Sequence, residues 1–315
     1  MAGQLWTTDT LGGFMYSDQL SDTLRTKLQP LTRFRNFCDV EDAKDKGTGD
    51  TFSWNVYSDV ATQGAALAEG SAMPETNFTI TQESMTITEM GNSVPYTRKL
   101  DILSKHSCER VIDKVLKNDA CKTLDTAAYT EFNKTKLTVT AGGTGDSATT
   151  ISAINTDGTA GGITNNVALR KEHVKLIADA MAERNITPYD GENYCALGRP
   201  SSIRAFKDDL EAISFYIESG FSRIAAGETG RYEGIRFFTQ TNIASEGWSN
   251  SKSDAVFFFG ADTVAEAIVE PEQIRAKLPG DYGRSRGMAW MYIGGFGICH
   301  TVAANSRIIK WDSAA

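Results

Sequence analysis

The clearest alternation of apolar and polar residues runs over positions 51–57. Phe52, Trp54 and Val56 fall on one side of an extended chain, and the residues between them are polar. A period of two is typical of a strand with one half-buried face. The pattern therefore predicts a β-strand here, with these three side chains packing on another surface. A stacking platform for sugars or bases is the alternative, but the strand has none of the basic residues that such a platform uses.

Two further apolar runs, at 78–80 and 85–87, predict a strand that returns beside the first. About twenty small and polar residues separate the two, including Gly64 and Gly70. A connection of this length is unusual within a compact domain and is typical of contact with a partner. We therefore predict a long hairpin with a protruding tip.

The apolar period changes to four residues between positions 100 and 136, and no proline interrupts this stretch. The apolar residues that recur in this way are Val111 and Val115, Ile112 and Leu116, and then Leu124, Ala128 and Phe132. This spacing places side chains on one helical face. It predicts a single helix of about 50 Å, at ~1.5 Å per residue, with Val115 packed against a sheet.

The remaining segments alternate between helix and strand signals. Helices are predicted over 166–185 and 203–211, and strands over the segments 194–197, 235–242, 255–260, 288–303 and 306–311, the last two as a pair. Every residue of 255–260 is apolar, as in a strand buried on both faces. The first 48 residues are predicted to be irregular apart from a short helix over 18–31, and residues 138–165, rich in Thr, Gly and Ala, to be a surface insertion.

The chain has 315 residues, which is room for one large domain or two ordinary ones. Its net charge of −8 argues against a sequence-reading nucleic-acid binder, which would show a basic face. The five cysteines are widely spaced and form no Cys-x-x-Cys pair, so we expect reduced, buried thiols. The first residues lack the features of a signal peptide. The densest apolar run, 255–261, is too short to cross a bilayer, so no membrane partner is expected.

Residues suited to catalysis or to metal binding are present, but their context is wrong. His106, His173 and His300 accompany no nucleophile motif. The acidic stretch 39–50 lacks the residue order of a calcium loop. The glycines at 142–145 lack the Lys-Ser/Thr of a P-loop. We therefore predict no enzymatic activity, no metal and no cofactor, and expect the glycines at 294–297 to allow close backbone packing or a bulge.

The most informative motif is Gly-Glu-Thr-Gly-Arg-Tyr-Glu-Gly at 227–234, followed by Ile-Arg-Phe-Phe-Thr-Gln-Thr-Asn. It resembles a glycine-bounded turn and strand found in one branch of the tailed-phage major capsid proteins. Residues 67–70, Leu-Ala-Glu-Gly, are also similar to a Leu-x-Glu-Gly loop tip of that family. Arg231 in the turn is either a phosphate ligand or, as we favour, a partner for an acid across a subunit contact.

The resemblance implies the α+β Hong Kong 97-type capsid fold along the whole chain. It implies these parts: an N-terminal arm (1–48), a long E-loop hairpin (49–95), a peripheral domain with a spine helix (96–145), an axial domain (146–269) and C-terminal strands that complete the peripheral domain (270–315). The Thr/Gly-rich region near 138–165 is a departure from the family pattern.

The resemblance also implies function. The chain would be a major capsid protein that assembles into pentamers and hexamers of an icosahedral head around double-stranded DNA, in the host bacterial cytoplasm and then in the virion. Partners would be a portal and decoration protein and, because the chain begins at Met1 without a scaffolding segment, a separate scaffolding protein. The expected assembly contacts are Phe52, Trp54, Val56, Leu67, Glu69 and Arg231. The alternatives are an encapsulin-type compartment and a β-rich hydrolase or surface-binding protein.

Overall fold

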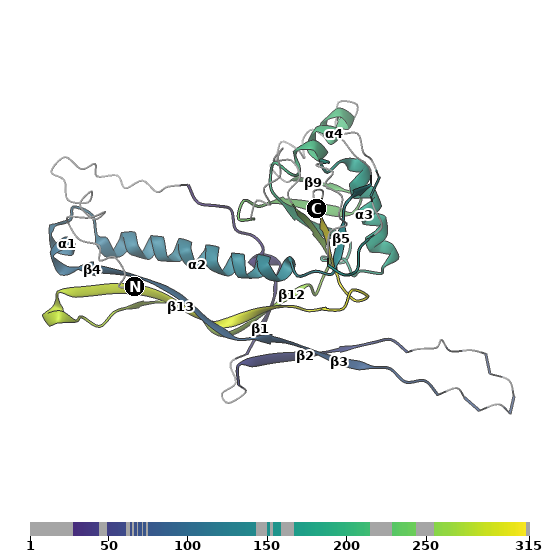
Figure 1. Cartoon of the computed structure of the whole chain (residues 1–315), viewed down its shortest axis with the longest axis horizontal. Coiled ribbons are helices and arrows are strands. Elements are labelled where there is room, and N and C mark those ends of the chain that lie inside the picture. The colour runs from purple at the N-terminus through teal and green to yellow at the C-terminus, as the bar shows by residue number, and fades with distance from the viewer. Residues whose placement is uncertain are drawn as a thin grey trace.

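The structure is a computed structural model, and it describes residues 28–43, 49–60, 64, 66–67, 69–70, 72–73, 75–142, 150–151, 154–158, 167–214, 229–243 and 255–312. Two bodies are seen in Figure 1, an elongated one built on a long sheet and a rounder one at one end of it. A two-stranded hairpin leaves the junction of the two bodies and extends away from both.

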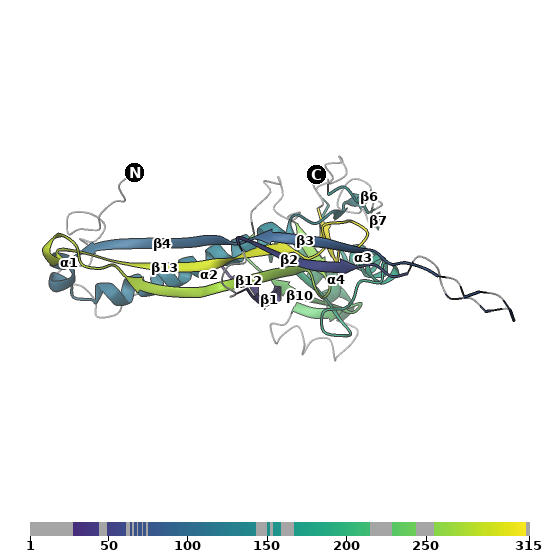
Figure 2. The same ribbon diagram turned by 90° about the horizontal axis from the view of Figure 1, so that it is seen from below.

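The elongated body is a four-stranded sheet covered on one face by a long helix. Its strand order is β1 (Asp39–Asp42), β12 (Val264–Ala276), β13 (Ser285–Ile298) and β4 (Thr88–Thr97). The two long central strands are antiparallel, with a register shift beside Pro271 in β12, because proline cannot donate to the ladder. Figure 2 shows β4, β13 and β12 running side by side along the body. The 3₁₀ turn η3 (Asp281–Gly283) connects β12 to β13.

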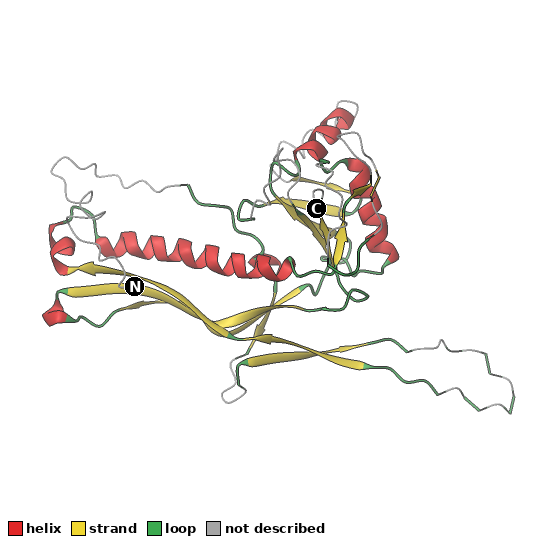
Figure 3. Ribbon diagram, in the orientation of Figure 1, coloured by secondary structure: helices red, strands yellow, loops and turns green. Residues whose placement is uncertain are grey.

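The predicted single helix is in fact two helices, α1 (Arg98–Leu103) and α2 (Cys108–Phe132), shown in red in Figure 3. The chain turns between them at Ser104, whose backbone is extended. The Ser104 hydroxyl donates to the carbonyl oxygen of His106 at 2.7 Å and so competes with helical hydrogen bonding. The residues at the break, 104–107, are polar, but no proline or glycine marks it, so the pattern predicted one helix.

The buried face of α2 winds around the helix axis. Every fourth residue from Cys108 onward is buried: Cys108, Ile112, Leu116, Ala120, Leu124, Ala128 and Phe132. Four residues advance about 40° beyond one full turn, so the buried stripe turns steadily as the helix follows the twisted sheet. Val115 lies off this stripe and is 52% exposed. The prediction that it packs against the sheet is wrong.

The rounder body is a six-stranded sheet with helices α3 (Lys171–Glu183) and α4 (Arg204–Ser214). Its strand order is β5 (Leu137–Val139), β14 (Ile308–Trp311), β11 (Val256–Phe259), β8 (Tyr194–Gly198), β10 (Ile235–Thr239) and β9 (Thr229–Tyr232). The last two predicted strands therefore do not pair with each other. β13 belongs to the long sheet and β14 to this one, because the chain crosses between the bodies at 299–307.

Most predicted elements of this body are confirmed, and each observed end lies within five residues of the predicted one. The helix predicted over 166–185 begins later, at Lys171, although Val167 is buried as expected. The glycine-rich turn joins β9 to β10 through Glu233 and Gly234, both at positive φ (47° and 72°). Two such residues form the tight turn that fits the twist of a hairpin. A small two-stranded sheet, β6 (Ala141–Gly142) with β7 (Thr150–Ile151), lies in the Thr/Gly-rich region.

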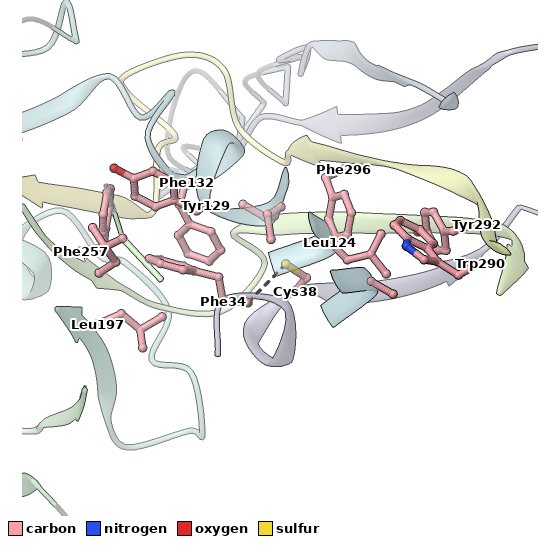
Figure 4. Close-up of a cluster of buried hydrophobic side chains, with 14 of the residues drawn as sticks. Phe34, Cys38, Leu124, Tyr129, Phe132, Leu197, Phe257, Trp290, Tyr292 and Phe296 are labelled. Atoms are coloured by element: carbon pink, nitrogen blue, oxygen red, sulfur yellow. Dashed lines mark hydrogen bonds between the residues drawn. The ribbon is translucent and has the colours of Figure 1, made fainter. Parts of the chain in front are cut away.

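β11 joins the cores of the two bodies. Phe257 and Phe259 point into one hydrophobic cluster, while Val256 and Phe258 point into the other. The first cluster lies under α2 and is shown in Figure 4, with Phe34 among the aromatic rings of Tyr129, Phe132 and Phe257. The prediction of a strand buried on both faces is confirmed, since all four residues of β11 are buried.

The N-terminal segment is more ordered than predicted. After a 3₁₀ turn, η2 (Arg35–Phe37), residues Asp39–Asp42 form β1, which pairs in parallel with β12. The acidic composition of this stretch concealed a strand, because its side chains lie on a solvated edge of the sheet and need no apolar alternation. Residues 18–27 of the predicted first helix lie outside the described residues, and residues 28–31 are not helical.

Candidate functional site

The hairpin of β2 (Thr51–Tyr57) and β3 (Ile80–Thr86) is the first candidate assembly surface. Its strands pair in register from Thr51 opposite Thr86 to Tyr57 opposite Ile80. The chain then continues outward beyond the last paired residues, away from both bodies (Figure 1). Large apolar side chains on the hairpin are exposed in the single subunit: Tyr57, Val60, Leu67, Met73, Phe78 and Ile80.

The root of the hairpin packs on its own chain. The Trp54 indole donates from Nε1 to the carbonyl oxygen of Cys299 at 3.1 Å, and the Phe52 ring lies 6.5 Å from the Trp54 ring. Both rings pack with Met85 and with Ala265 and Ala267 of β12. Phe52 and Trp54, which the sequence suggested for contacts between subunits, are thus occupied within the subunit. Val56 lies further out along β2 and is half-buried.

Glycines of β13 let the hairpin cross the long sheet at close range. A methyl group on Gly295 would lie 2.5 Å from the carbonyl oxygen of Thr86, and one on Gly297 would lie 2.7 Å from Cβ of Met85. Real side chains do not approach so closely, so only glycine permits this crossing. The expectation of close backbone packing at 294–297 is confirmed.

The other sequence-predicted contact residues lie apart from one another. Leu67 and Glu69 are exposed near the hairpin tip. Arg231 is on β9 of the rounder body, 53% exposed, and it pairs with Glu192 of the same chain at 4.0 Å. Other exposed residues of the hairpin, such as Phe78, were not predicted as contacts. Their apolar character is evident in the sequence, but their exposure follows from the way the hairpin leaves the body.

A second candidate site lies where the two bodies meet, and no pattern in the sequence predicted it. Residues 31–42, which we call the strap, cross this junction. The Arg35 guanidinium bonds Glu266 of β12 at 2.8 Å and Glu272 at 2.9 Å. Glu266 is 1% exposed and also accepts from the Tyr292 hydroxyl at 3.0 Å. Burial acts to lower the pKa of Arg35, but the bonds to the two carboxylates outweigh it and raise that pKa.

Asp125 of α2 forms the other half of the junction. Its carboxylate accepts from the backbone amide of Arg35 at 3.3 Å, from Nε2 of Gln240 at 2.6 Å and from Nδ2 of Asn242 at 2.9 Å. Residues 240–242, which we call the corner, follow β10 of the rounder body. Burial raises the pKa of Asp125, and the hydrogen bonds that it accepts oppose this shift only in part. Asp125 therefore links the strap, α2 and the rounder body.

Burial also shifts the pKa of two side chains that are candidates for acid–base chemistry. Burial lowers the pKa of His300, and burial raises the pKa of Cys299 to about 12. Among the described residues no group of three or more His, Cys, Asp or Glu is placed to hold a metal ion. All five cysteines are free, as expected, although Cys121 is exposed rather than buried. No helix in the described part of the chain is long and apolar enough to span a membrane.

Comparison with known proteins gives a result at the level of structure. No protein-family model and no curated sequence matches this chain. Among solved structures, the capsid of cyanophage P-SCSP1u is similar at 11% identity and a TM-score of 0.67, covering 98% of this chain and 94% of that one. The capsid of Ralstonia phage GP4 has 14% identity and a TM-score of 0.67, with 95% of each chain covered.

A third structure, the capsid of cyanophage Pam1, aligns over 100% of both chains at 15% identity and a TM-score of 0.67. At such low identity the agreement lies in the path of the backbone, and it extends through the strap, the hairpin, both sheets and the final strands. The chain therefore has the α+β fold of tailed-phage capsid proteins of the Hong Kong 97 type, as its sequence motifs predicted.

Proposed function

We propose that this chain is a major capsid protein that assembles into the pentamers and hexamers of an icosahedral phage head. The observation that carries the proposal is the match of the whole chain to capsid subunits, with 95% or more of this chain covered in three structures. A fold by itself does not fix a function. The exposed apolar hairpin is an independent reason, because apolar side chains exposed on a protruding segment are typical of a surface that contacts another protein.

The hairpin reaches a neighbouring subunit in this proposal. Its outer part exposes Met73 at 71%, Phe78 at 57% and Ile80 at 61%. Apolar side chains gathered on a protruding segment mark a protein contact. A hairpin of one subunit that lies on the next makes a head-to-tail contact, which closes into a ring. Many such contacts in a shell stabilise one another by multivalency.

We keep the five-part division of the chain as part of this proposal, with one adjustment. β4 pairs with β13 in the long sheet, so we place the end of the E-loop hairpin at Thr86 and assign β4 to the peripheral domain. Leu67, Glu69 and Arg231 remain our proposed contacts between subunits, as does Val56 in the outer half of β2. Phe52 and Trp54 instead anchor the hairpin.

The proposed partners are further copies of the chain, a scaffolding protein, a portal, a decoration protein and packaged DNA. The DNA contact is unspecific, because the net charge of −8 leaves no broad basic footprint. Of the basic residues 25, 27, 33 and 35 of the arm, Arg35 is engaged by two carboxylates, and residues 25 and 27 lie outside the described residues. We propose that the protein assembles in the bacterial host cytoplasm, resides in the virion and has no catalytic role.

Electron microscopy of the expressed chain, with and without the scaffold candidate encoded near it, tests the proposal. We expect closed shells, and a stable monomer under both conditions would contradict it. An encapsulin-type compartment of the same fold is the alternative. Nuclease-protected DNA inside particles purified from infected cells supports the capsid, while a cargo enzyme inside supports the compartment.

A further inference from the structure

His300 lies near the start of segment 299–307, which carries the chain from the long sheet to the rounder body and which we call the crossing segment. Both ring nitrogens of His300 are buried and have no hydrogen-bond partner among the described residues. A neutral imidazole offers one donor and one acceptor, so both are left unsatisfied at this site. Buried polar groups are nearly always paired. This histidine is therefore an exception that needs a physical explanation.

The root of the hairpin is bonded to the residues on both sides of His300. The Trp54 indole donates from Nε1 to the carbonyl oxygen of Cys299 at 3.1 Å. The Thr301 hydroxyl donates to Oε1 of Glu83 at 2.6 Å. One bond involves β2 and the other β3, so both strands of the hairpin are attached to the crossing segment next to His300. A movement that brings the His300 ring into water would disturb both bonds.

The charged groups around His300 favour a neutral ring. Arg307 of the crossing segment, Asp262 of the turn between β11 and β12, and Glu83 of β3 all act on it. Arg307 and Asp262 pair with each other at 2.5 Å, and Glu83 is bonded by Thr301. Burial lowers the pKa of His300, and the positive charge of Arg307 lowers it further, against the weaker opposite effect of the two acids.

We propose that His300 makes the attachment of the hairpin sensitive to acid: when its ring takes up a proton, the crossing segment opens and releases the root of the hairpin. A protonated imidazole carries two N–H donors, and neither ring nitrogen has an acceptor among the described residues. Water satisfies both donors once the segment opens. The bonds of Cys299 and Thr301 to the hairpin break in the open state, because these residues move with His300.

The direction of the effect follows from the linkage between proton binding and opening. In the open state His300 has the ordinary histidine pKa of ~6.5, and in the closed state its pKa is lower. The open state therefore binds more protons than the closed state, and acid favours it. If the closed state binds no proton, the opening equilibrium rises about tenfold by one pH unit below ~6.5.

The consequence for a shell rests on the proposed function, in which the hairpin contacts a neighbouring subunit. Histidine is the side chain whose ordinary pKa lies in the range of mild acid, and its protonation can change an interface there. Release of the hairpin root would loosen the contact between subunits as the pH falls below ~6.5. The opening itself is a property of the single subunit.

Thiol labelling of the unassembled, full-length subunit tests the opening, because Cys299 adjoins His300 and is only partly exposed. A disulfide reagent that reacts in mild acid is applied at a series of pH values, and each cysteine is quantified by peptide mass spectrometry. The exposed Cys121 is the reference, so that the pH dependence of the reagent cancels. The ratio of Cys299 to Cys121 labelling should rise about tenfold from pH ~7.5 to ~5.5.

Matched variants separate His300 from other groups that titrate. H300Q and H300N keep a neutral polar side chain at every pH, so the ratio should not rise in either, and H300N decides the result if H300Q does not fold. H106Q removes a histidine between α1 and α2 and should behave as the wild type. An unchanged ratio in the wild type, an equal rise in the His300 variants, or equal acceleration at the buried Cys195 of β8 would overturn the proposal.

Assembly provides a separate readout. By electron microscopy, the wild type should form fewer closed shells at pH ~5.5 than at ~7.5, whereas H300Q should form them equally at both. Equal numbers of wild-type shells at the two pH values would contradict the link between His300 and assembly. A wild-type chain that forms no shells at either pH would contradict the proposed function and leave the labelling comparison valid, so the two ideas fail separately.

Discussion

Glu266 is 1% exposed within an otherwise apolar part of β12, and two side chains bond its carboxylate there. Arg35 approaches from the strap, the Tyr292 hydroxyl donates from β13, and the Arg35 guanidinium lies 5.7 Å from the centre of the Tyr292 ring. A buried carboxylate without such partners costs several kcal/mol. This single residue therefore makes the long sheet dependent on the strap.

Replacing Arg35 by alanine should destabilise the subunit by about 3 kcal/mol, the low end for breaking a buried pair, because Arg35 itself is 24% exposed. Urea unfolding of the unassembled subunit measures the loss. The control is R284A, whose pair with Asp281 is exposed on both sides and should change stability by less than about 1 kcal/mol. Equal small losses in the two variants would mean that Glu266 does not need Arg35.

Asp125 and Glu272 should give opposite pH dependences. Burial raises the folded-state pKa of Asp125, so its contribution to stability is complete below its unfolded pKa of ~3.9 and is lost as the pH rises through the folded value. D125N removes this loss. The stability of the wild type relative to D125N should therefore fall as the pH rises from ~4.

The hydrogen bond from Arg35 lowers the folded-state pKa of Glu272, so its contribution is present above the unfolded pKa of ~4.3 and is lost as the pH falls through the folded value. The stability of the wild type relative to E272Q should rise with pH over that range. Unfolding curves at a series of pH values measure both differences, and slopes of the same sign would contradict the assignment.

At the scale of elements, α2 is held by a stripe of residues four apart that turns with the sheet. Leu116 lies on the stripe and is 1% exposed, while its neighbour Val115 is 52% exposed. L116D should bury an unpaired charge at a cost of several kcal/mol and give insoluble or unfolded protein. V115D should give soluble protein with an unchanged circular dichroism spectrum. Soluble, folded L116D would contradict this assignment of the buried face.

The crossing of the hairpin over β13 gives a second prediction at this scale. G295A places a methyl group against the backbone of Thr86, which cannot move without shifting the strand, so we expect a loss of about 1–3 kcal/mol. The matched control is G280A, because no heavy atom lies within 4 Å of a Cβ there and the φ of −102° suits alanine. Thermal melts compare the two variants. An unchanged melting temperature for G295A would show that the crossing has room for a side chain.

At the scale of the whole molecule, the hairpin is anchored at its root by Trp54 and Met85 and extends outward from there. Deleting residues 64–73 removes part of the outer segment and leaves the β2–β3 ladder intact. The variant should be folded, with the melting behaviour of the wild type, but should form no closed shells by electron microscopy. Normal shells from this variant would show that the outer segment is not an assembly device.

Elements with local signals could be predicted from the sequence. Alternation over 51–57 gave β2 to the residue, and the all-apolar run gave β11, because burial on one or both faces is recorded directly in residue type. Gly234 and the glycines at 294, 295 and 297 were informative because each answers a local steric demand, either a positive φ or a close approach of other atoms. The motif resemblance then gave the fold as a whole.

Features that depend on contacts between distant residues follow only from the tertiary structure. The acidic β1 is a strand because β12 pairs with it, and the helix break at Ser104 carries no proline or glycine that would mark it in the sequence. Which side of α2 is buried follows from the twist of a sheet whose two long central strands, β12 and β13, lie far from α2 in sequence. The junction of Arg35, Asp125 and the corner shows no local pattern, since its members interact only after both bodies have formed.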